Sequence, residues 1–267
     1  LLASGDLDGD GHLDLAANLG NSGQIGLFFG DGHGDFTLDS DEILTTASYY
    51  PTDLLAHDLD NDGALDLVVL GDYRNIAVFM NRFGTGGGFE PAPGCDPSGC
   101  PYRTPENAYS LAVADLTGDG VADIQIPFAL DGVLLVGDGT GGFTRRLQGE
   151  LKLTHPAIAP GDPCHNPGNS CARPFRHDNG FAPATGDFTG DGRVDLALHG
   201  YLNYQKQVPA LCENCRKYVL VIVELDDYGM PLPSPRVFVA PSNESYAYGL
   251  LALHLDGKKE ALEFDKD

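Results

Sequence analysis

Short apolar runs alternate with glycine- and aspartate-rich segments along most of the chain. The runs are rich in β-branched and aromatic residues, as in Leu65–Leu70 and Tyr218–Val223. They are too short for helices, and no sustained helical periodicity connects them. The pattern therefore predicts an all-β protein with strands over residues 13–17, 25–29, 65–70, 76–79, 124–126, 133–136, 194–198 and 218–223.

One acidic motif occurs four times along the chain. Its first copy, residues 6–14, reads Asp-Leu-Asp-Gly-Asp-Gly-His-Leu-Asp, and the other copies occupy residues 58–66, 115–123 and 187–195. We call these segments the first to fourth acidic loops. A glycine-rich element that ends in phenylalanine follows each of the first three loops, at residues 29–36, 83–89 and 137–143. Two linked elements that recur in one order, with strand-like runs between them, predict the four-stranded antiparallel blades of a β-propeller.

These repeats resemble the FG-GAP repeats of integrin α-subunit propellers and of many bacterial extracellular proteins. The resemblance covers nearly the whole chain and implies a single β-propeller domain over residues 1–267, with each acidic loop joining the first two strands of a blade. The implied blades are residues 1–51, 52–108, 109–180 and 181–245, with a partial fifth at 246–267. The fifth unit has lysines where carboxylates belong, so no metal is assigned to it. Four full blades and a partial fifth predict part of a larger ring, completed by missing blades or by a further chain.

Each acidic loop has the composition to wrap around one calcium ion. Calcium takes six to eight oxygen ligands in a flexible geometry, and glycine at loop position 6 permits the sharp turn. Positions 1, 3, 5 and 9 supply side-chain oxygens and position 7 a backbone carbonyl. Thr117 and Thr189 replace aspartate at position 3, so we expect the third and fourth loops to bind more weakly than the first two. The predicted ligands are Asp6, Asp8, Asp10, His12, Asp14, Asp58, Asp60, Asp62, Ala64, Asp66, Asp115, Thr117, Asp119, Val121, Asp123, Asp187, Thr189, Asp191, Arg193 and Asp195.

Other interpretations of the acidic loops fit the sequence less well. An EF-hand needs a glutamate at position 12, where this chain has Ala17, Val69, Ile126 and Leu198. Magnesium rarely uses cages made only of protein ligands. Ion-free Asp-Gly turns would leave clustered carboxylates repelling one another. We therefore predict up to four calcium ions, mainly with a structural role.

The charge balance restricts the classes of partner. The chain carries 39 Asp and Glu against 16 Lys and Arg, a formal net charge of −23. Nucleic-acid binders need a basic face to displace counterions, so nucleic-acid binding is excluded. The sequence also lacks an apolar run long enough for a membrane helix, so no membrane insertion is expected.

Six cysteines fall into three local pairs, namely Cys95 with Cys100, Cys164 with Cys171 and Cys212 with Cys215. Local pairs in polar, proline-rich loops indicate disulfides in an oxidising compartment, and hence a secreted or cell-surface protein. The last pair has the C-x-x-C spacing of zinc sites, which leaves zinc or redox chemistry as an alternative. The first two pairs lie in segments that look inserted into a minimal blade, residues 91–107 and 154–180. Such loops either contact a partner or protect blade edges.

The function that fits best is a non-enzymatic extracellular calcium-binding module. It would serve adhesion, structure or assembly, and the family resemblance implies protein or carbohydrate ligands and leaves self-assembly open. The chain has no Gly-x-Ser-x-Gly nucleophile motif, and its glycine-rich turns precede strands instead of phosphate-binding helices. The alternative is the propeller domain of a secreted enzyme that acts on polysaccharides or lipids, because similar propellers occur within such enzymes.

Overall fold

The computed structural model describes residues 1–20, 22–46, 50–95, 100, 102, 104, 108–127, 132–149, 175–177, 183–204, 215–233 and 235–239. Its strands are β1 (Leu2–Gly5), β2 (Asp14–Asn18), β3 (Gln24–Gly30), β4 (Phe36–Thr45), β5 (Pro51–His57), β6 (Asp66–Gly71), β7 (Ile76–Asn81), β8 (Phe89–Pro91), β9 (Ala112–Ala114), β10 (Asp123–Ile126), β11 (Gly132–Gly137), β12 (Phe143–Gly149), β13 (Phe175–His177), β14 (Ala184–Gly186), β15 (Asp195–Tyr204), β16 (Cys215–Val223) and β17 (Arg236–Val239). Two short 3-10 helices, η1 (Asp72–Arg74) and η2 (Phe83–Thr85), are the helical elements of the described part.

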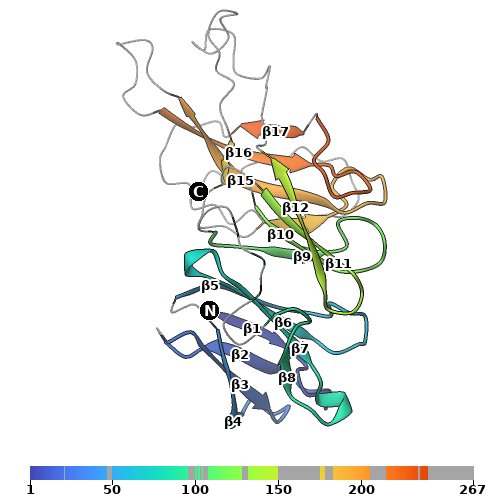
Figure 1. Cartoon of the computed structure of the whole chain (residues 1–267). Coiled ribbons are helices and arrows are strands. Elements are labelled where there is room, and N and C mark those ends of the chain that lie inside the picture. Colours follow the sequence, from blue (N-terminus) through green and yellow to red (C-terminus); the bar gives the residue numbers. More distant parts are fainter. Residues whose placement is uncertain are drawn as a thin grey trace, which may run out of the picture.

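The strands form four antiparallel sheets that follow one another along the chain (Figure 1). The first three sheets each have four strands in sequence order, β1 to β4, β5 to β8 and β9 to β12. In the fourth sheet both β13 and β14 pair with β15, which pairs with β16 and then β17. The four sheets are consistent with blades of a β-propeller, and the described residues form a partial propeller without a closed ring. Strand β13 lies in residues 109–180, which were assigned to the third blade, but it pairs with β15 of the fourth sheet. The predicted partial fifth blade, residues 246–267, lies outside the described residues.

The sheets stack through apolar side chains because the middle strands present such side chains on both faces. Every residue of β6, β7, β10 and β11 is buried. Full burial on both faces requires a neighbour on each side, which the continuous apolar runs in the sequence predict. One apolar cluster fills each of the three spaces between successive sheets, and these clusters include Leu27 with Phe79, Val78 with Leu135, and Leu134 with Val221.

The first sheet has one covered face and one open face within the described part of the chain. Leu27 on the covered face is fully buried. On the other face, Leu2 lies in register with Ala17, Gly26 and Ile43, and Leu2 and Ile43 are 60% and 37% exposed. An apolar row on each face is typical of a blade that has two neighbours.

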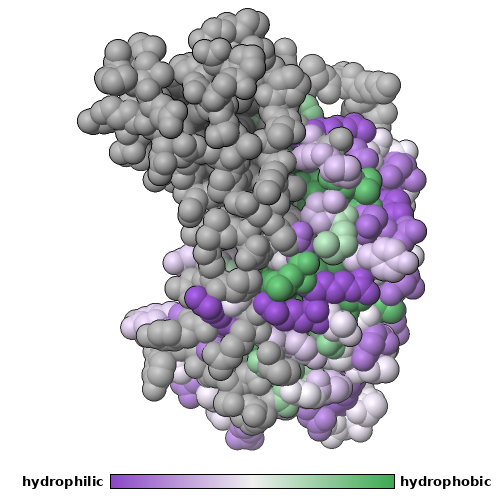
Figure 2. All heavy atoms as spheres, turned by 45° about the horizontal axis from the view of Figure 1, so that its top comes forward, coloured by the Kyte–Doolittle hydropathy of each residue, from purple (hydrophilic) through white to green (hydrophobic). Residues whose placement is uncertain are grey.

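The surface in Figure 2 is mostly hydrophilic where the structure describes it, with small apolar patches. This agrees with the strongly acidic composition. Among the described residues, no helix has the length and apolar character to span a membrane.

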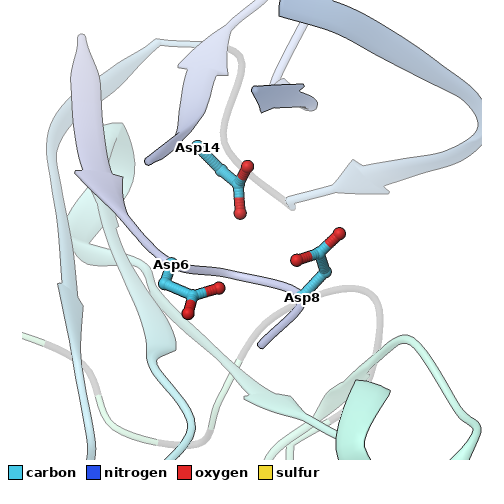
Figure 3. Close-up of side chains that lie close together, drawn as sticks. All are labelled: Asp6, Asp8 and Asp14. Carbon is cyan, nitrogen blue, oxygen red and sulfur yellow. The ribbon is translucent and has the colours of Figure 1, made fainter. Parts of the chain in front are cut away.

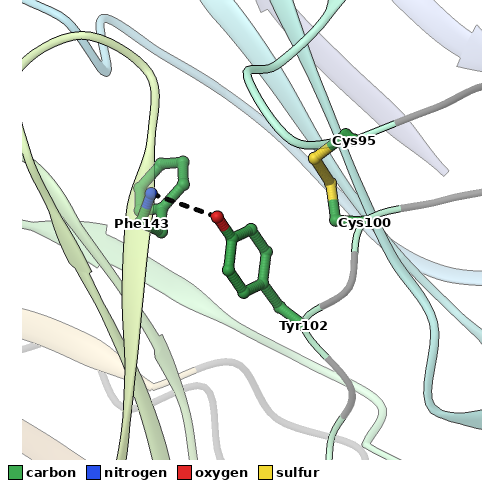
Figure 4. The surroundings of a disulfide bond; sticks show 4 residues. All are labelled: Cys95, Cys100, Tyr102 and Phe143. Carbon is green, nitrogen blue, oxygen red and sulfur yellow. Dashed lines mark hydrogen bonds between the residues drawn. A yellow bond between two sulfur atoms is a disulfide. The ribbon is translucent and has the colours of Figure 1, made fainter.

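A disulfide between Cys95 and Cys100 closes the segment after β8 (Figure 4). Cys100 is only 6% exposed and belongs to the apolar cluster between the second and third sheets. The Tyr102 hydroxyl accepts a hydrogen bond from the Phe143 N–H of β12 at 3.3 Å, and the two rings meet edge to face. This part of the predicted insertion therefore helps to join the second blade to the third. The cysteine side chains of the other two predicted pairs lie outside the described residues.

Candidate metal centre

The four acidic loops share one backbone framework. Each loop joins two antiparallel strands, and the residue before the loop pairs with its ninth residue, as Gly5 does with Asp14. Positions 4 and 6 have a positive φ in all four loops. Glycine adopts this left-handed backbone without steric cost and occupies these positions, except at position 4 of the second loop, where Asn61 has a φ of 60°.

The carboxylate at position 1 organises the loop backbone. In the first loop, Asp6 Oδ1 accepts a hydrogen bond from the Gly9 N–H at 2.7 Å, and Oδ2 accepts one from the Gly11 N–H at 2.9 Å. In the other three loops, the position 1 carboxylate accepts from the N–H groups of positions 5 and 6. These bonds lower the pKa of the exposed Asp187, and the bond from the Gly192 N–H contributes most. These hydrogen bonds hold the position 1 carboxylate in a fixed orientation in all four loops.

The carboxylate at position 9 is buried and ties the loop to the sheet. Asp14, Asp66, Asp123 and Asp195 are each at most 1% exposed. Their Oδ2 atoms accept the backbone N–H of loop position 2. In the first three loops, Oδ1 accepts an N–H from the end of the third strand of the sheet. Position 9 thus connects three segments of each of these blades.

Burial of the position 9 carboxylates has an electrostatic cost. Removal from water raises the pKa of Asp66 to about 6 and also raises the pKa of Asp123 and Asp195. The backbone hydrogen bonds to these groups act in the opposite direction and do not fully offset the desolvation. A nearby cation would stabilise the ionised form of each carboxylate.

Side chains at positions 1, 3 and 9 converge in the first two loops. Figure 3 shows the carboxylates of Asp6, Asp8 and Asp14 pointing toward one another. One carboxylate oxygen from each lies within 4.8 Å of the others, and Asp58, Asp60 and Asp66 form the same arrangement in the second loop. Three hard oxygen donors at this spacing suit a divalent cation such as calcium.

The oxygen at position 3 lacks a protein partner in three of the four loops. Asp60 Oδ1, Thr117 Oγ1 and Thr189 Oγ1 are buried and make no hydrogen bond. The Asp60 side chain is 9% exposed, and Thr117 is 8% exposed. Each threonine hydroxyl lies near the position 9 carboxylate of its own loop and acts to lower the pKa of that carboxylate. The two groups do not, however, have the geometry of a hydrogen bond. Buried polar atoms are nearly always paired, so three orphan oxygens at one repeated position fit a metal ligand set.

In each loop, the aspartate at position 5 also holds the backbone of position 7. At each position 5, the aspartate Oδ1 accepts the N–H of position 7, which is His12, Ala64, Val121 or Arg193. The structure brings neither Asp10 nor Asp62 into the three-carboxylate groups. Asp10 instead lies 3.1 Å from the His12 imidazole, and Asp62 contacts an arginine.

That arginine, Arg82, is a site residue that the sequence analysis missed. Its Nη1 atom lies 3.1 Å from Asp60 Oδ2 and 3.1 Å from Asp62 Oδ2. Arg82 directly follows Asn81, whose N–H donates to the position 9 carboxylate, just as Asp31 follows Gly30 and Asp138 follows Gly137 in the first and third sheets. The sequence hides this equivalence, because the second turn has two more residues between this position and its closing phenylalanine than the other two turns have.

Two asparagines link neighbouring blades at the loops and were also missed. Asn81 is 2% exposed, and its Nδ2 donates to the Leu7 carbonyl of the first loop at 2.7 Å. Asn61 Nδ2 donates to the Gly120 carbonyl of the third loop at 2.8 Å. The first three acidic loops are therefore connected by side-chain hydrogen bonds.

The comparison with protein families agrees with the repeat pattern. A family model described as an FG-GAP-like repeat matches residues 6–69 and 58–125. No curated protein matches the chain. Among solved structures, an Agrocybe aegerita lectin, described as specifically recognising non-reducing terminal N-acetylglucosamine, aligns with 17% identity and a TM-score of 0.43. The alignment covers 90% of this chain, which spans 65% of the lectin chain.

Proposed function

The chain belongs to the FG-GAP repeat family through its repeats over residues 6–125, and from this premise we propose that it is an extracellular calcium-binding β-propeller module with a structural, adhesive or assembly role. The orphan oxygens at position 3 carry this proposal, because they recur in three loops and need a ligand that the protein does not supply.

Calcium would be held by the same positions in each loop. Positions 1, 3 and 9 supply side-chain oxygens, position 7 a backbone carbonyl, and position 5 its second carboxylate oxygen. The bound cation would neutralise carboxylates that otherwise repel one another inside a partly buried corner. Within the protein, position 9 fixes the loop to the third strand, while position 1 holds the loop backbone in its tight curve.

The proposed role of calcium is to stabilise the corners of the blades. At 1 mM calcium, a site with a Kd of ~0.1 mM adds about 1.4 kcal/mol to folding. Four such sites would add roughly 6 kcal/mol, a large part of the stability of a typical domain. The module would then be fully folded outside the cell, where calcium is abundant.

We propose that the module acts by binding protein or carbohydrate partners and not by catalysis. The FG-GAP-like repeats and the disulfide between Cys95 and Cys100 support an extracellular location. The loop carboxylates at positions 1 and 9 are occupied by backbone hydrogen bonds, which suits a structural task.

Calcium titration tests the proposal. Isothermal titration of the calcium-free chain should give up to four ions, and Asp123→Asn should remove one of them. Asp35→Asn, an exposed aspartate in a glycine-rich turn, is the matched control and should leave the count unchanged. Absence of calcium binding to the folded chain at millimolar calcium would refute the proposed function.

A further inference from the structure

The glycine-rich turn of the second sheet differs in charge from its counterparts. Asp31 and Asp138 accept hydrogen bonds from the N–H groups two residues later, both at 2.8 Å. Arg82 replaces this aspartate in the second turn, although its N–H still donates to the Gly88 carbonyl at 3.0 Å. The turn is therefore closed by the backbone, and the arginine side chain is available for another contact.

The Arg82 side chain extends into the second acidic loop. One guanidinium nitrogen donates to Asp60 Oδ2 and Asp62 Oδ2, at 3.1 Å in each case. The Arg82 side chain is 28% exposed and that of Asp60 is 9% exposed, so solvent screens this contact only in part. The other oxygen of Asp60, Oδ1, stays buried without a partner. The guanidinium thus offsets the negative charges of positions 3 and 5 but leaves one carboxylate oxygen of position 3 without a partner.

The other loops differ from this arrangement within the part of the chain that the structure describes. Arg193 of the fourth loop pairs with Asp227, which lies outside any acidic loop. The first loop has the same four aspartates as the second, but there Asp10 contacts the His12 imidazole instead of an arginine. The first and second loops therefore offer calcium the same carboxylates. They differ because an arginine contacts the carboxylates of the second loop.

We propose that Arg82 is an internal counter-ion that competes with calcium for the second acidic loop. This inference rests on the proposed calcium-binding function. A guanidinium at ion-pair distance from two ligand carboxylates repels an entering divalent cation and must move or share those oxygens. The second loop therefore binds calcium more weakly than the first, although their carboxylate sets are identical. Ligand charge alone would instead predict equal calcium affinities for these two loops.

The same contact has the opposite effect on the protein without calcium. Arg82 offsets repulsion among the carboxylates of the second loop, so the loop keeps its conformation when no ion is bound. Neutralising Arg82 should therefore destabilise the calcium-free protein and tighten calcium binding. A residue with only a packing role would not produce these opposite changes.

The test compares Arg82→Gln with Arg145→Gln, which removes the same charge from an exposed position on β12. In calorimetric titrations of the full chain, Arg82→Gln should tighten one calcium site at least tenfold, equal to about 1.4 kcal/mol. It should also lower the melting temperature in a calcium-free buffer. Arg145→Gln should change the calcium Kd by no more than about twofold, the size expected for a distant, screened charge. It should also leave the melting temperature in calcium-free buffer unchanged.

A double-mutant cycle assigns the effect to the second loop. In an Asp58→Asn background, which disables that loop, Arg82→Gln should no longer alter calcium binding. If Arg82→Gln does not fold, Arg82→Met keeps the aliphatic stem and must show the same tightening. Unchanged affinities in a protein that still binds several calcium ions would overturn this inference and leave the proposed function intact. Absence of calcium binding to the wild-type chain would instead refute the proposed function.

Discussion

Replacing Thr117 by valine should change the stability in opposite directions with and without calcium. The Thr117 hydroxyl is buried at position 3 of the third loop and has no hydrogen-bond partner. A buried unsatisfied hydroxyl costs about 1–3 kcal/mol, and valine has nearly the same shape. Without calcium, the variant should be more stable by ~1 kcal/mol, which corresponds to about 2–4 °C in melting temperature for a chain of this size.

With saturating calcium, the same substitution should destabilise the protein. Valine removes one ligand from the third loop, and loss of the site forfeits the ~1.4 kcal/mol that a bound ion adds at ten times its Kd. This loss exceeds the ~1 kcal/mol gained by removing the hydroxyl, so the net destabilisation is about 0.4 kcal/mol at ten times the Kd and grows as calcium is raised. Thermal melts followed by circular dichroism measure both changes. One series is run in calcium-free buffer and the other at 10 mM calcium, roughly ten or more times the Kd of extracellular modules.

Thr46→Val is the matched control for this experiment. The Thr46 hydroxyl is also buried but donates to the Gly23 carbonyl at 3.1 Å, away from the acidic loops. Its loss should destabilise the protein by about 1 kcal/mol whether or not calcium is present. The reasoning would be refuted if Thr117→Val behaved like this control, because the hydroxyl would then have a partner within the protein.

Three further predictions concern the blade contacts and the titration of the loops. Replacing Cys95 and Cys100 by serine should cost about 2 kcal/mol by the loop-entropy relation, seen as a lower urea midpoint than that of the oxidised wild type. Asn81→Ala should lower the free energy of unfolding by about 2 kcal/mol in chemical denaturation, because it leaves buried backbone groups of two blades unpaired, including the Leu7 carbonyl. A change below 0.5 kcal/mol, the scatter of neutral surface mutations, would contradict the assigned contact. Burial raises the pKa of Asp66 to about 6, above its unfolded value of 3.8. Because the folded protein without metal then binds this proton more tightly than the unfolded chain does, Asp66 stabilises that fold at low pH. This contribution is lost as the pH rises through 6. Stabilisation by calcium should accordingly grow as the pH rises toward 6 and level off above it, whereas Asp66→Asn should flatten this profile.

The fold could be predicted from the sequence because its signals are local and repeated. The acidic loops fix where the first two strands of each blade meet, and the apolar runs mark the strands that are buried on both faces. The positions of β10 and β11 differ from the predicted strands by a residue or less at each end. Repetition supplied four independent copies of the same pattern.

The contacts between blades could not be predicted in the same way. Asn61, Arg82 and Tyr102 act across the spaces between loops or sheets, and their partners are set by how neighbouring elements are placed. The ligand pattern predicts the same calcium affinity for the first and second loops, because it counts only the charges within each loop. Arg82 lies outside the second loop in the sequence but contacts its carboxylates in the fold. The additional strand β13 was missed because its three residues pair with β15 without belonging to the repeated motif.

Anomalous diffraction from crystals grown with calcium is the most direct test of the account. A peak is expected within each acidic loop, next to the oxygens of positions 1, 3 and 9, with the second loop filling after the first as calcium is increased. Acidic loops that stay empty at saturating calcium, with Asp60 Oδ1 and Thr117 Oγ1 bonded only to water, would contradict it.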